Sequence, residues 1–308
     1  MIPIFNEKYN YIMLYVPKAA CSVMRKTYVD FHYSEFTKEQ LSILTDKNKL
    51  FHGLAGVHSG NRLPSSVFYD TPRFIVARNP YKRALSAYYD KFIYLRNNNT
   101  WKTTKLYNLF CVFQITNDIE LLKTLTSLEE VHKCNLLFYE YIKTTKINYY
   151  NNNDNINDSF EKYLEFILMC KTHNIKTYDE HHDLQSAISN KFNINKVFEN
   201  PYIVQIENFQ NNLTECINKL LSNKDDIERY LKLFAQNSQN PKVRNANFKQ
   251  VYENIDGSVK GRSYFLKRVT EKETILNTGS MVSSKCEELI YNIYKQDFDL
   301  LSYVRKSF

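Results

Sequence analysis

Two short apolar runs near the start of the chain each lead through a polar turn into a segment of helix-compatible residues. The first run covers residues 11–16, and the segment that follows it continues to about residue 31. The second unit covers residues 73–95 in the same order of strand, turn and helix. Short apolar runs bounded by turns are typical of buried strands, and apolar positions three or four apart are typical of helices. The pattern therefore predicts two β-turn-α units in the first third of the chain.

Apolar periodicity predicts one more strand and further helices later in the chain. Residues 202–206 form an apolar run typical of a buried strand, and residues 210–221 and 284–301 have helical patterns. Another helix is expected to start near Asp158, which can form a capping box with Glu161. The apolar face of that helix consists of Phe160, Tyr163, Leu164, Ile167 and Leu168. Strands that alternate with helices predict an α/β fold with a central, mostly parallel sheet flanked by helices, plus helical insertions.

The organisation of the chain is simple. It has no internal repeat and no linker rich in proline or glycine, so a single domain over residues 1–308 is expected. Residues 148–157 are rich in asparagine and are interpreted as a surface loop. Residues 38–64 are polar and are expected to be irregular. An apolar stripe at helical spacing in the second unit predicts core positions: Tyr81, Leu85, Tyr88, Tyr89 and Phe92.

Composition shows a net positive charge and gives no indication of a zinc site, a signal peptide or a membrane span. The formal net charge of +8 suits a polyanionic ligand, and an ordinary solvated basic surface explains it equally well. The six cysteines are scattered without a Cys-x-x-Cys pair, so zinc spacing is absent and most are expected to be small buried residues. No signal peptide and no apolar run of membrane-spanning length is present. A protein without a membrane span is therefore expected.

The turn after the first apolar run is the first candidate site. Lys18 stands in this turn, and Ser22 lies at the start of the helix-compatible segment. Strand, turn and helix in this order direct backbone N–H groups and the positive end of a helix dipole at one point, and Lys18 adds a full charge there. The arrangement suits a phosphate or a sulfate. An exposed lysine beside a serine cap is the simpler alternative.

The turn after the second apolar run is the second candidate site. Arg78 is placed at the end of the strand, where ligands bind in open parallel sheets. Asn79 fits the cap position and Pro80 the first position of the following helix. Arg83, further along this helix, could bind a ligand or brace the helix, and both roles remain open.

These two segments resemble the two signatures of sulfotransferases that use 3′-phosphoadenosine 5′-phosphosulfate (PAPS). Residues 17–22, Pro-Lys-Ala-Ala-Cys-Ser, resemble the loop that binds the 5′-phosphosulfate, in a form closest to the carbohydrate sulfotransferases. The second segment resembles the motif that binds the 3′-phosphate. It matches that motif at Arg78, Asn79, Pro80, Tyr81, Arg83, Ser86 and Tyr88.

Weaker similarities to the same family continue downstream in the right order. Residues 179–185 resemble an Asp-x-His-x-x-x-Gln segment, residues 205–209 a strand-end element with glutamate, and residues 294–303 a terminal Tyr-x-x-Asp-Phe helix. The chain departs from the family pattern at Ala20, where many members have glycine. Val23 and Met24 replace a frequent pair of a polar residue and tryptophan.

The resemblance implies a P-loop-like, three-layer fold and sulfuryl transfer from PAPS to a carbohydrate or glycolipid hydroxyl. Lys18 would contact the bridging and leaving oxygens, and Arg78 and Ser86 would bind the 3′-phosphate. The 5′-phosphate would be held by the backbone and the serine hydroxyl of Ala19, Ala20, Cys21 and Ser22. Cys21 fits this loop as a small residue in a tight turn. PAPS is already activated, so no metal is required.

The acceptor hydroxyl needs a general base, and histidine suits that task near neutral pH. Uronyl-type relatives carry the base in a His-Gly pair at a similar distance before the second signature, which makes His52 the first choice. His58 is the second choice, and His181 is the third. Golgi relatives carry an N-terminal membrane anchor, whereas this chain begins almost directly at its first predicted strand. A cytoplasmic, bacterial-type enzyme is therefore expected.

Two other functions remain open on the residues alone. The chain has six glycines and lacks Gly-x-x-x-x-Gly-Lys-Ser/Thr and Gly-x-Gly-x-x-Gly, which disfavours an ordinary ATPase or nicotinamide enzyme. A non-catalytic basic protein that binds a glycan or nucleic acid is one alternative, although no long basic run interleaved with aromatics supports nucleic acid. A small-molecule kinase with a degenerate phosphate loop is the other. Residues 257–262 fit a basic lid or an ordinary turn, and the oligomeric state is not predicted.

Overall fold

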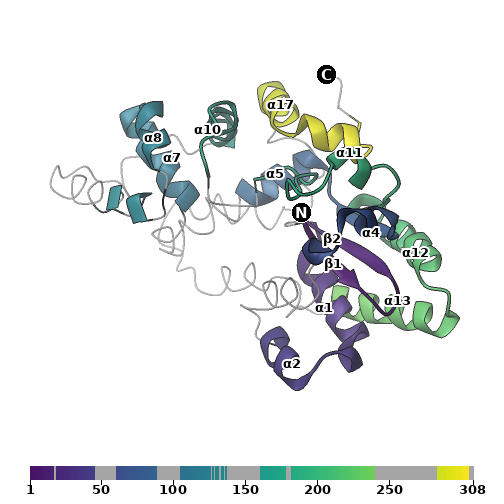
Figure 1. The fold of residues 1–308 in the computed structure, drawn as a ribbon. Helices are drawn as coiled ribbons and strands as arrows, with labels where there is room; N and C mark the ends of the chain where they lie inside the picture. Colours follow the sequence, from purple (N-terminus) through teal and green to yellow (C-terminus); the bar gives the residue numbers. More distant parts are fainter. Residues whose placement is uncertain are drawn as a thin grey trace, which may run out of the picture. The chain divides into compact units, whose positions relative to one another are not determined.

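The computed structural model describes residues 1–16, 19–45, 60–88, 105–125, 127, 129–131, 133–134, 136, 160–177, 182–239 and 283–304 (Figure 1). The chain divides into two compact units. The first consists of Met1–Asn79 and Gln185–Met281, and the second of Pro80–Leu184 and Val282–Phe308. The prediction of a single domain over residues 1–308 stays a prediction.

A four-stranded sheet forms the centre of the first unit. Its strands β1 (Ile2–Asn6), β2 (Tyr11–Tyr15), β3 (Arg73–Ala77) and β4 (Tyr202–Gln205) lie in that order across the sheet. β1 runs antiparallel to β2, whereas β2, β3 and β4 are parallel. Every residue of β2 and β3 is buried, as expected for apolar strands in the middle of a covered sheet. The mostly parallel sheet and its flanking helices confirm the predicted α/β fold.

Helices cover this sheet within the first unit. The longer ones are α1 (Cys21–Phe31), α12 (Phe209–Leu220) and α13 (Lys224–Gln239). α1 packs against α13 (Figure 1), and α12 packs against β4. The shorter elements are η1 (Tyr33–Glu35), α2 (Lys38–Thr45), η2 (Gly60–Arg62), α4 (Ser65–Asp70), α11 (Ile194–Val197) and η5 (Ile206–Asn208).

The described part of the second unit is helical. It contains α5 (Pro80–Tyr88), α7 (Lys105–Thr116), α8 (Ile119–Thr124), α10 (Phe160–Thr172) and α17 (Ser284–Leu300). α17 packs against both α5 and α10. Tyr81 contacts Phe298 with ring centroids 5.2 Å apart, and Tyr88 contacts Phe160 at 5.1 Å. Tyr81, Leu85 and Tyr88 are buried, which confirms the predicted stripe as far as the helix is described; residues 89 and 92 lie outside the described part.

The sequence patterns did not predict several elements, among them β1, α2, α7 and α13, and are correct for others. β1 was not predicted, because its five residues include Pro3 and it pairs only with β2 as an edge strand. Residues 38–64 were expected to be irregular, which is wrong for residues 38–45, because these form α2. The helix begins with a reciprocal cap: the Gln40 N–H donates to Thr37 Oγ1 at 3.2 Å, and the Thr37 N–H donates to Gln40 Oε1 at 2.8 Å. The predicted late strand and the helices over 210–221 and 284–301 are confirmed as β4, α12 and α17.

The described cysteines behave as small apolar residues. Cys111, Cys170, Cys216 and Cys286 are buried, and burial raises the pKa of the last three thiols. No helix in the described part of the chain is both long and apolar enough to span a bilayer. The asparagine-rich segment 148–157, the cap residue Asp158 and residues 257–262 lie outside the described residues.

Candidate functional site

Three parallel strands end at one edge of the sheet in the first unit. Leu14 of β2 pairs with Ile75 of β3, and Ala77 of β3 pairs with Gln205 of β4. The segments that follow these strands therefore begin at the same edge. Crevices outside the carboxyl ends of parallel strands are the usual ligand sites of open α/β sheets. Both predicted anion-binding segments start here, one after β2 and the other after β3.

The turn after β2 leads into the N-terminus of α1. The Ala19 N–H donates to the Val16 carbonyl at 3.3 Å, and the Met24 N–H donates to the Ala20 carbonyl at 3.0 Å. Ala20 is the N-cap of α1 and has the left-handed conformation, with φ 51° and ψ 22°. An alanine side chain cannot accept a hydrogen bond, so it leaves the N–H groups of the first helical turn without a side-chain cap. These donors and the helix dipole suit an anion.

The structure places part of the predicted 5′-phosphosulfate loop. Ala19 is buried, Ala20 is half-buried, and Ser22 is half-buried in the first turn of α1. Cys21 is described as the first residue of α1 by its backbone alone. Lys18 lies outside the described residues, as do the three histidines considered as the base: His52, His58 and His181.

Arg78 directly follows β3, and its peptide groups are held by a distant side chain. The Arg78 N–H donates to Gln185 Oε1 at 2.9 Å, and Gln185 Nε2 donates to the Arg78 carbonyl at 2.7 Å. Gln185 is only 1% exposed. It is the last residue of the segment that resembles Asp-x-His-x-x-x-Gln, so this weak similarity now has a structural role beside the second signature.

The N–H of the peptide group between Arg78 and Asn79 is held by the segment after β4, whereas its carbonyl accepts from Gln185. The Asn79 N–H donates to Glu207 Oε1 at 3.0 Å, and Glu207 belongs to the strand-end element over residues 205–209. Sequence reasoning did not name Gln185 or Glu207 as site residues. The available signal was their position in two segments that resemble the family, one ending in an amide and the other holding a carboxylate.

Ser86 lies in the second unit, half-buried on α5. Pro80 starts that helix, as predicted.

Arg83 on α5 is 1% exposed and is held by contacts within the second unit. Its Nη1 donates to the Asp183 carbonyl at 2.7 Å, and its guanidinium lies 5.8 Å from the ring centroid of Tyr294. Of the two roles left open for Arg83, these contacts favour bracing the helix. Burial raises the pKa of Tyr294 to about 12, although Arg83 opposes that rise, so the phenol is neutral at physiological pH.

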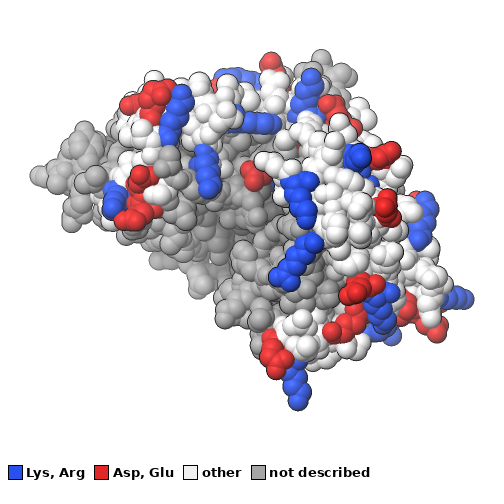
Figure 2. Space-filling view, in the orientation of Figure 1, with Lys and Arg blue, Asp and Glu red and all other residues white. Residues whose placement is uncertain are grey.

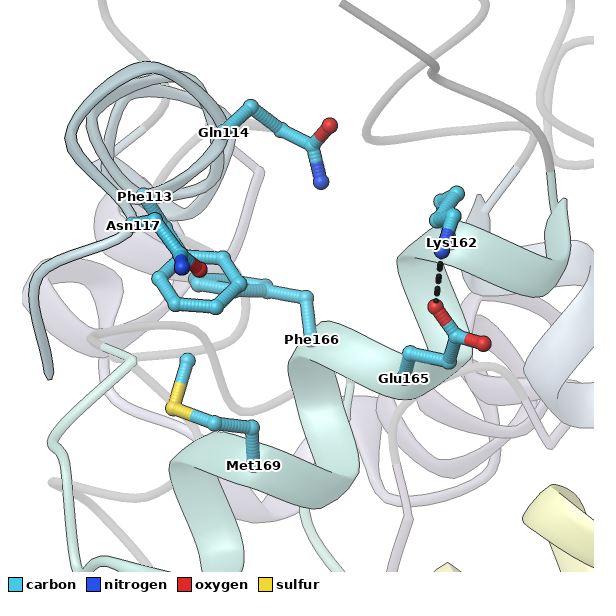
Figure 3. A pocket seen from close by; sticks show the side chains of 7 residues that line it. All are labelled: Phe113, Gln114, Asn117, Lys162, Glu165, Phe166 and Met169. Carbon is cyan, nitrogen blue, oxygen red and sulfur yellow. Dashed lines mark hydrogen bonds and ion pairs between the residues drawn. The ribbon is translucent and has the colours of Figure 1, made fainter.

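The second unit also contains a pocket between α7 and α10, with a volume of about 400 Å³ (Figure 3). Its lining is Phe113, Gln114, Asn117, Lys162, Glu165, Phe166 and Met169. The rings of Phe113 and Phe166 have centroids 5.8 Å apart. The Gln114 amide extends from α7 toward the side of the pocket where Lys162 lies, and Asn117, which directly follows α7, lies beside the aromatic rings (Figure 3). Of the predicted site residues that the structure describes, none lines this pocket.

The charges at this pocket compensate one another. Glu165 accepts from Lys162 at 2.7 Å and from Lys285 at 2.6 Å, and Lys285 also bonds Glu161 at 2.8 Å. The hydrogen bonds from Lys162 and Lys285 lower the pKa of Glu165. The pocket therefore offers aromatic faces and neutral amides beside a paired set of charges.

A buried polar network in the first unit lies at the opposite end of β2 from the candidate site. The Tyr11 hydroxyl is 2.9 Å from His32 Nε2, and His32 Nδ1 is 2.9 Å from Glu35 Oε1. Asn6 Nδ2 donates to Glu35 Oε2 at 3.2 Å. Tyr11 is the first residue of β2, whereas the phosphosulfate loop follows its last residue. The network is therefore a structural feature that joins β1 and β2 to His32, the C-cap of α1, and to η1.

Neither the charges visible in Figure 2 nor the metal-binding groups of the described residues indicate a further site. Over the described part of the face in Figure 2, Lys and Arg side chains alternate with Asp and Glu instead of forming a continuous basic stripe. Within the described ranges, no three His, Cys, Asp or Glu side chains gather closely enough to hold a metal ion.

Comparison with known proteins gave one match. The model of the Sulfotransferase family matches residues 3–304, nearly the whole chain. Searches of curated proteins and of solved structures each gave no match.

Proposed function

The chain belongs to the sulfotransferase family, whose members transfer a sulfuryl group, and on that premise we propose that it moves this group from PAPS to a carbohydrate hydroxyl. The observation that carries the proposal is the sheet edge of the first unit. The uncapped N-terminus of α1 and the segment containing Arg78 both begin there. A nucleotide with phosphate groups at both its 5′ and 3′ positions needs two such anion sites.

The residues of the two signatures have separate tasks in this proposal. The Ala19 N–H is bonded to the Val16 carbonyl, so backbone N–H groups at Ala20–Ser22 and the Ser22 hydroxyl bind the 5′-phosphate in this proposal, and Arg78 and Ser86 bind the 3′-phosphate. Lys18 stabilises the negative charge that develops on the leaving phosphate. These assignments rest on the match of the residues to the two family signatures.

The proposed reaction is an in-line displacement at sulfur. A base removes the proton of the acceptor hydroxyl while its oxygen forms a bond to sulfur. The bond between sulfur and the 5′-phosphate oxygen breaks, and the products are a sulfate ester and adenosine 3′,5′-bisphosphate. Positioning of the two oxygens and neutralisation of the leaving phosphate are what a protein can contribute to such a transfer. His52 is the proposed base.

Binding of adenosine 3′,5′-bisphosphate tests the donor site. The protein should bind this product, measured by calorimetry, and transfer labelled sulfate from PAPS to an oligosaccharide. Lys18→Ala should abolish transfer, and Arg78→Ala should weaken binding of the bisphosphate. Lys224→Ala, which removes an exposed charge from the start of α13, is the control and should change neither measurement. Absence of any bisphosphate binding by the unchanged protein would refute the proposal.

The base is tested separately. His52→Ala should lower kcat by about 10²–10⁴-fold while leaving bisphosphate affinity unchanged, because a general base acts in the chemical step. His58→Ala and His181→Ala are the matched comparisons. If His58→Ala or His181→Ala gives the larger loss, the base is that residue and the assignment of His52 is wrong.

We further propose that the acceptor is a sugar bound in part by the pocket between α7 and α10. Aromatic side chains pack against the C–H faces of sugar rings, and Gln114 and Asn117 supply amides for hydroxyl groups. A pocket of about 400 Å³ is within the usual range for small ligands. The paired charges around Glu165 favour an uncharged sugar ring at this position.

A further inference from the structure

The Gln185 side chain satisfies both backbone groups of Arg78. Beyond Ala77, β3 has no further ladder partner in β4, since Ala77–Gln205 is the last pair of that register. The Gln185 amide accepts from the Arg78 N–H and donates to the Arg78 carbonyl, as a neighbouring strand would. A primary amide is the neutral side-chain group that offers an acceptor and a donor side by side. Gln185 therefore extends the ordered backbone of β3 by one residue.

The fixed backbone conformation at Arg78 sets the position and direction from which its side chain extends. Arg78 lies between Ala77, which is completely buried in β3, and Asn79, whose backbone is restricted because Pro80 follows. With both peptide groups of Arg78 bonded to a side chain that is 1% exposed, the direction of its Cα–Cβ bond is fixed. A guanidinium can bind a phosphate through two parallel hydrogen bonds only when its plane is correctly placed.

Glu207 holds the other side of the peptide group between Arg78 and Asn79, whose carbonyl is bonded to Gln185. Its Oε1 accepts from the Asn79 N–H at 3.0 Å. Glu207 itself is exposed and follows β4, so it reaches Asn79 from the neighbouring parallel strand. Gln185 and Glu207 together bond three consecutive backbone groups of the second signature.

We propose that Gln185, assisted by Glu207, is a positioning residue that fixes Arg78 for recognition of the 3′-phosphate of the donor. The proposal rests on the proposed function, because it assumes that Arg78 binds that phosphate. In this proposal, Gln185 and Glu207 contribute to selectivity for the 3′-phosphate through Arg78 and not by contact with the nucleotide.

The test compares two nucleotides that differ only in the 3′-phosphate. Affinities for adenosine 3′,5′-bisphosphate and adenosine 5′-monophosphate are measured by calorimetry with the full chain. Gln185→Met keeps the length of the side chain but removes both hydrogen bonds to Arg78. The substitution should reduce the ratio of the two affinities, which is the preference for the bisphosphate, by at least about tenfold, because a misplaced guanidinium binds the 3′-phosphate less well. Affinity for the monophosphate should remain within about twofold of the unchanged protein.

A second buried amide controls for general loss of stability. Asn237 is 6% exposed in the same unit and donates to Asp30 Oδ2 at 3.0 Å on α1. Asn237→Leu should lower the melting temperature but leave the nucleotide preference unchanged. If Gln185→Met does not fold, the exposed Glu207 provides the test. Glu207→Leu and Glu207→Gln remove the same charge, and only the latter keeps an acceptor for the Asn79 N–H.

The outcomes separate this inference from the proposed function. A lower bisphosphate preference in Gln185→Met and in Glu207→Leu, with Glu207→Gln close to the unchanged protein, supports the positioning role. Full preference in Gln185→Met, or an equal loss for both nucleotides, overturns it while the donor site stands. If the unchanged protein binds the two nucleotides equally well, the donor proposal fails and the inference fails with it.

Discussion

The left-handed backbone of Ala20 allows a stability prediction that two single substitutions can test. Ala20 has φ 51° and ψ 22° immediately before α1. This conformation costs a residue with a Cβ atom about 1–2 kcal/mol, and glycine adopts it without that cost. Glycine also gives the unfolded chain more freedom, which lowers stability by about 0.4–1 kcal/mol. The expected net effect of Ala20→Gly is therefore between no change and a gain of about 1.5 kcal/mol.

The neighbouring Ala19 is a matched control for this substitution. Its side chain is 1% exposed, and its φ is not in the left-handed range. Ala19→Gly loses a buried methyl group, worth about 0.8 kcal/mol, and has the same effect on the unfolded chain. It should therefore destabilise the protein by about 1–2 kcal/mol. Because the unfolded-state term is common to both variants, their stabilities should differ by about 2 kcal/mol.

Urea denaturation followed by circular dichroism measures this difference, provided that the two variants have equal slopes with denaturant. Ala20→Gly is also expected to keep its affinity for adenosine 3′,5′-bisphosphate, because the N–H groups of the first turn of α1 are unchanged. Equal destabilisation by Ala19→Gly and Ala20→Gly would show that Ala20 is not strained, and the account of this turn would then be wrong.

Acid, a thiol reagent and acceptor kinetics test other features of the two units. Burial alone would raise the pKa of Glu35, but its hydrogen bonds to His32 and neighbouring groups hold it below the ordinary 4.5. The ionised Glu35 carboxylate stabilises the fold fully above about pH 4.5, and this contribution is lost as the pH falls through the lowered pKa. In Glu35→Gln, the free energy of unfolding measured by urea titration should therefore fall less steeply with decreasing pH. An unchanged pH dependence would contradict this. Burial raises the pKa of the Cys170 thiol to about 12, so iodoacetamide should leave this residue unmodified in the native protein and alkylate it in urea. Mass spectrometry measures the modification, and alkylation of Cys170 in the native protein would count against its burial. Gln114→Leu and Asn117→Leu should each raise KM for a sugar acceptor by about threefold to tenfold without changing bisphosphate affinity, and an unaffected KM would remove the pocket from the acceptor site.

Several elements that bury apolar faces could be predicted from the sequence, whereas α7 and α13 bury apolar side chains and were not predicted. β2, β3 and β4 are short apolar runs, and α5 begins at a proline, so local pattern and turn chemistry agree for both β-turn-α units. β1 and α2 could not be recognised in the same way. β1 derives its stability from pairing with β2 at the edge of the sheet, which is a tertiary effect that its own five residues do not signal. α2 depends on a local cap rather than on a long apolar stripe.

The candidate site was predictable only in its local parts. Arg78 and the residues at the start of α1 stand in motifs of consecutive residues, and the sheet brings those motifs to one edge. Gln185 lies 107 positions from Arg78, and Glu207 lies 128 positions from Asn79. No periodicity or spacing relates residues so far apart, because their contact depends on the order of the strands and on the path of the intervening chain.

The hydrogen bonds between Arg78 and Gln185 also affect the chain between them. The chain leaves the first unit after Asn79 and returns to it at Gln185, so these bonds close the loop formed by residues 80–184 at its base. Helices that follow α5, the helix that carries Ser86, can be lengthened, shortened or exchanged inside such a closed loop without displacing the strands that precede and follow it. Under the proposed function, acceptor specificity could therefore diverge during evolution in the part of this loop that follows α5, while the donor site stays the same.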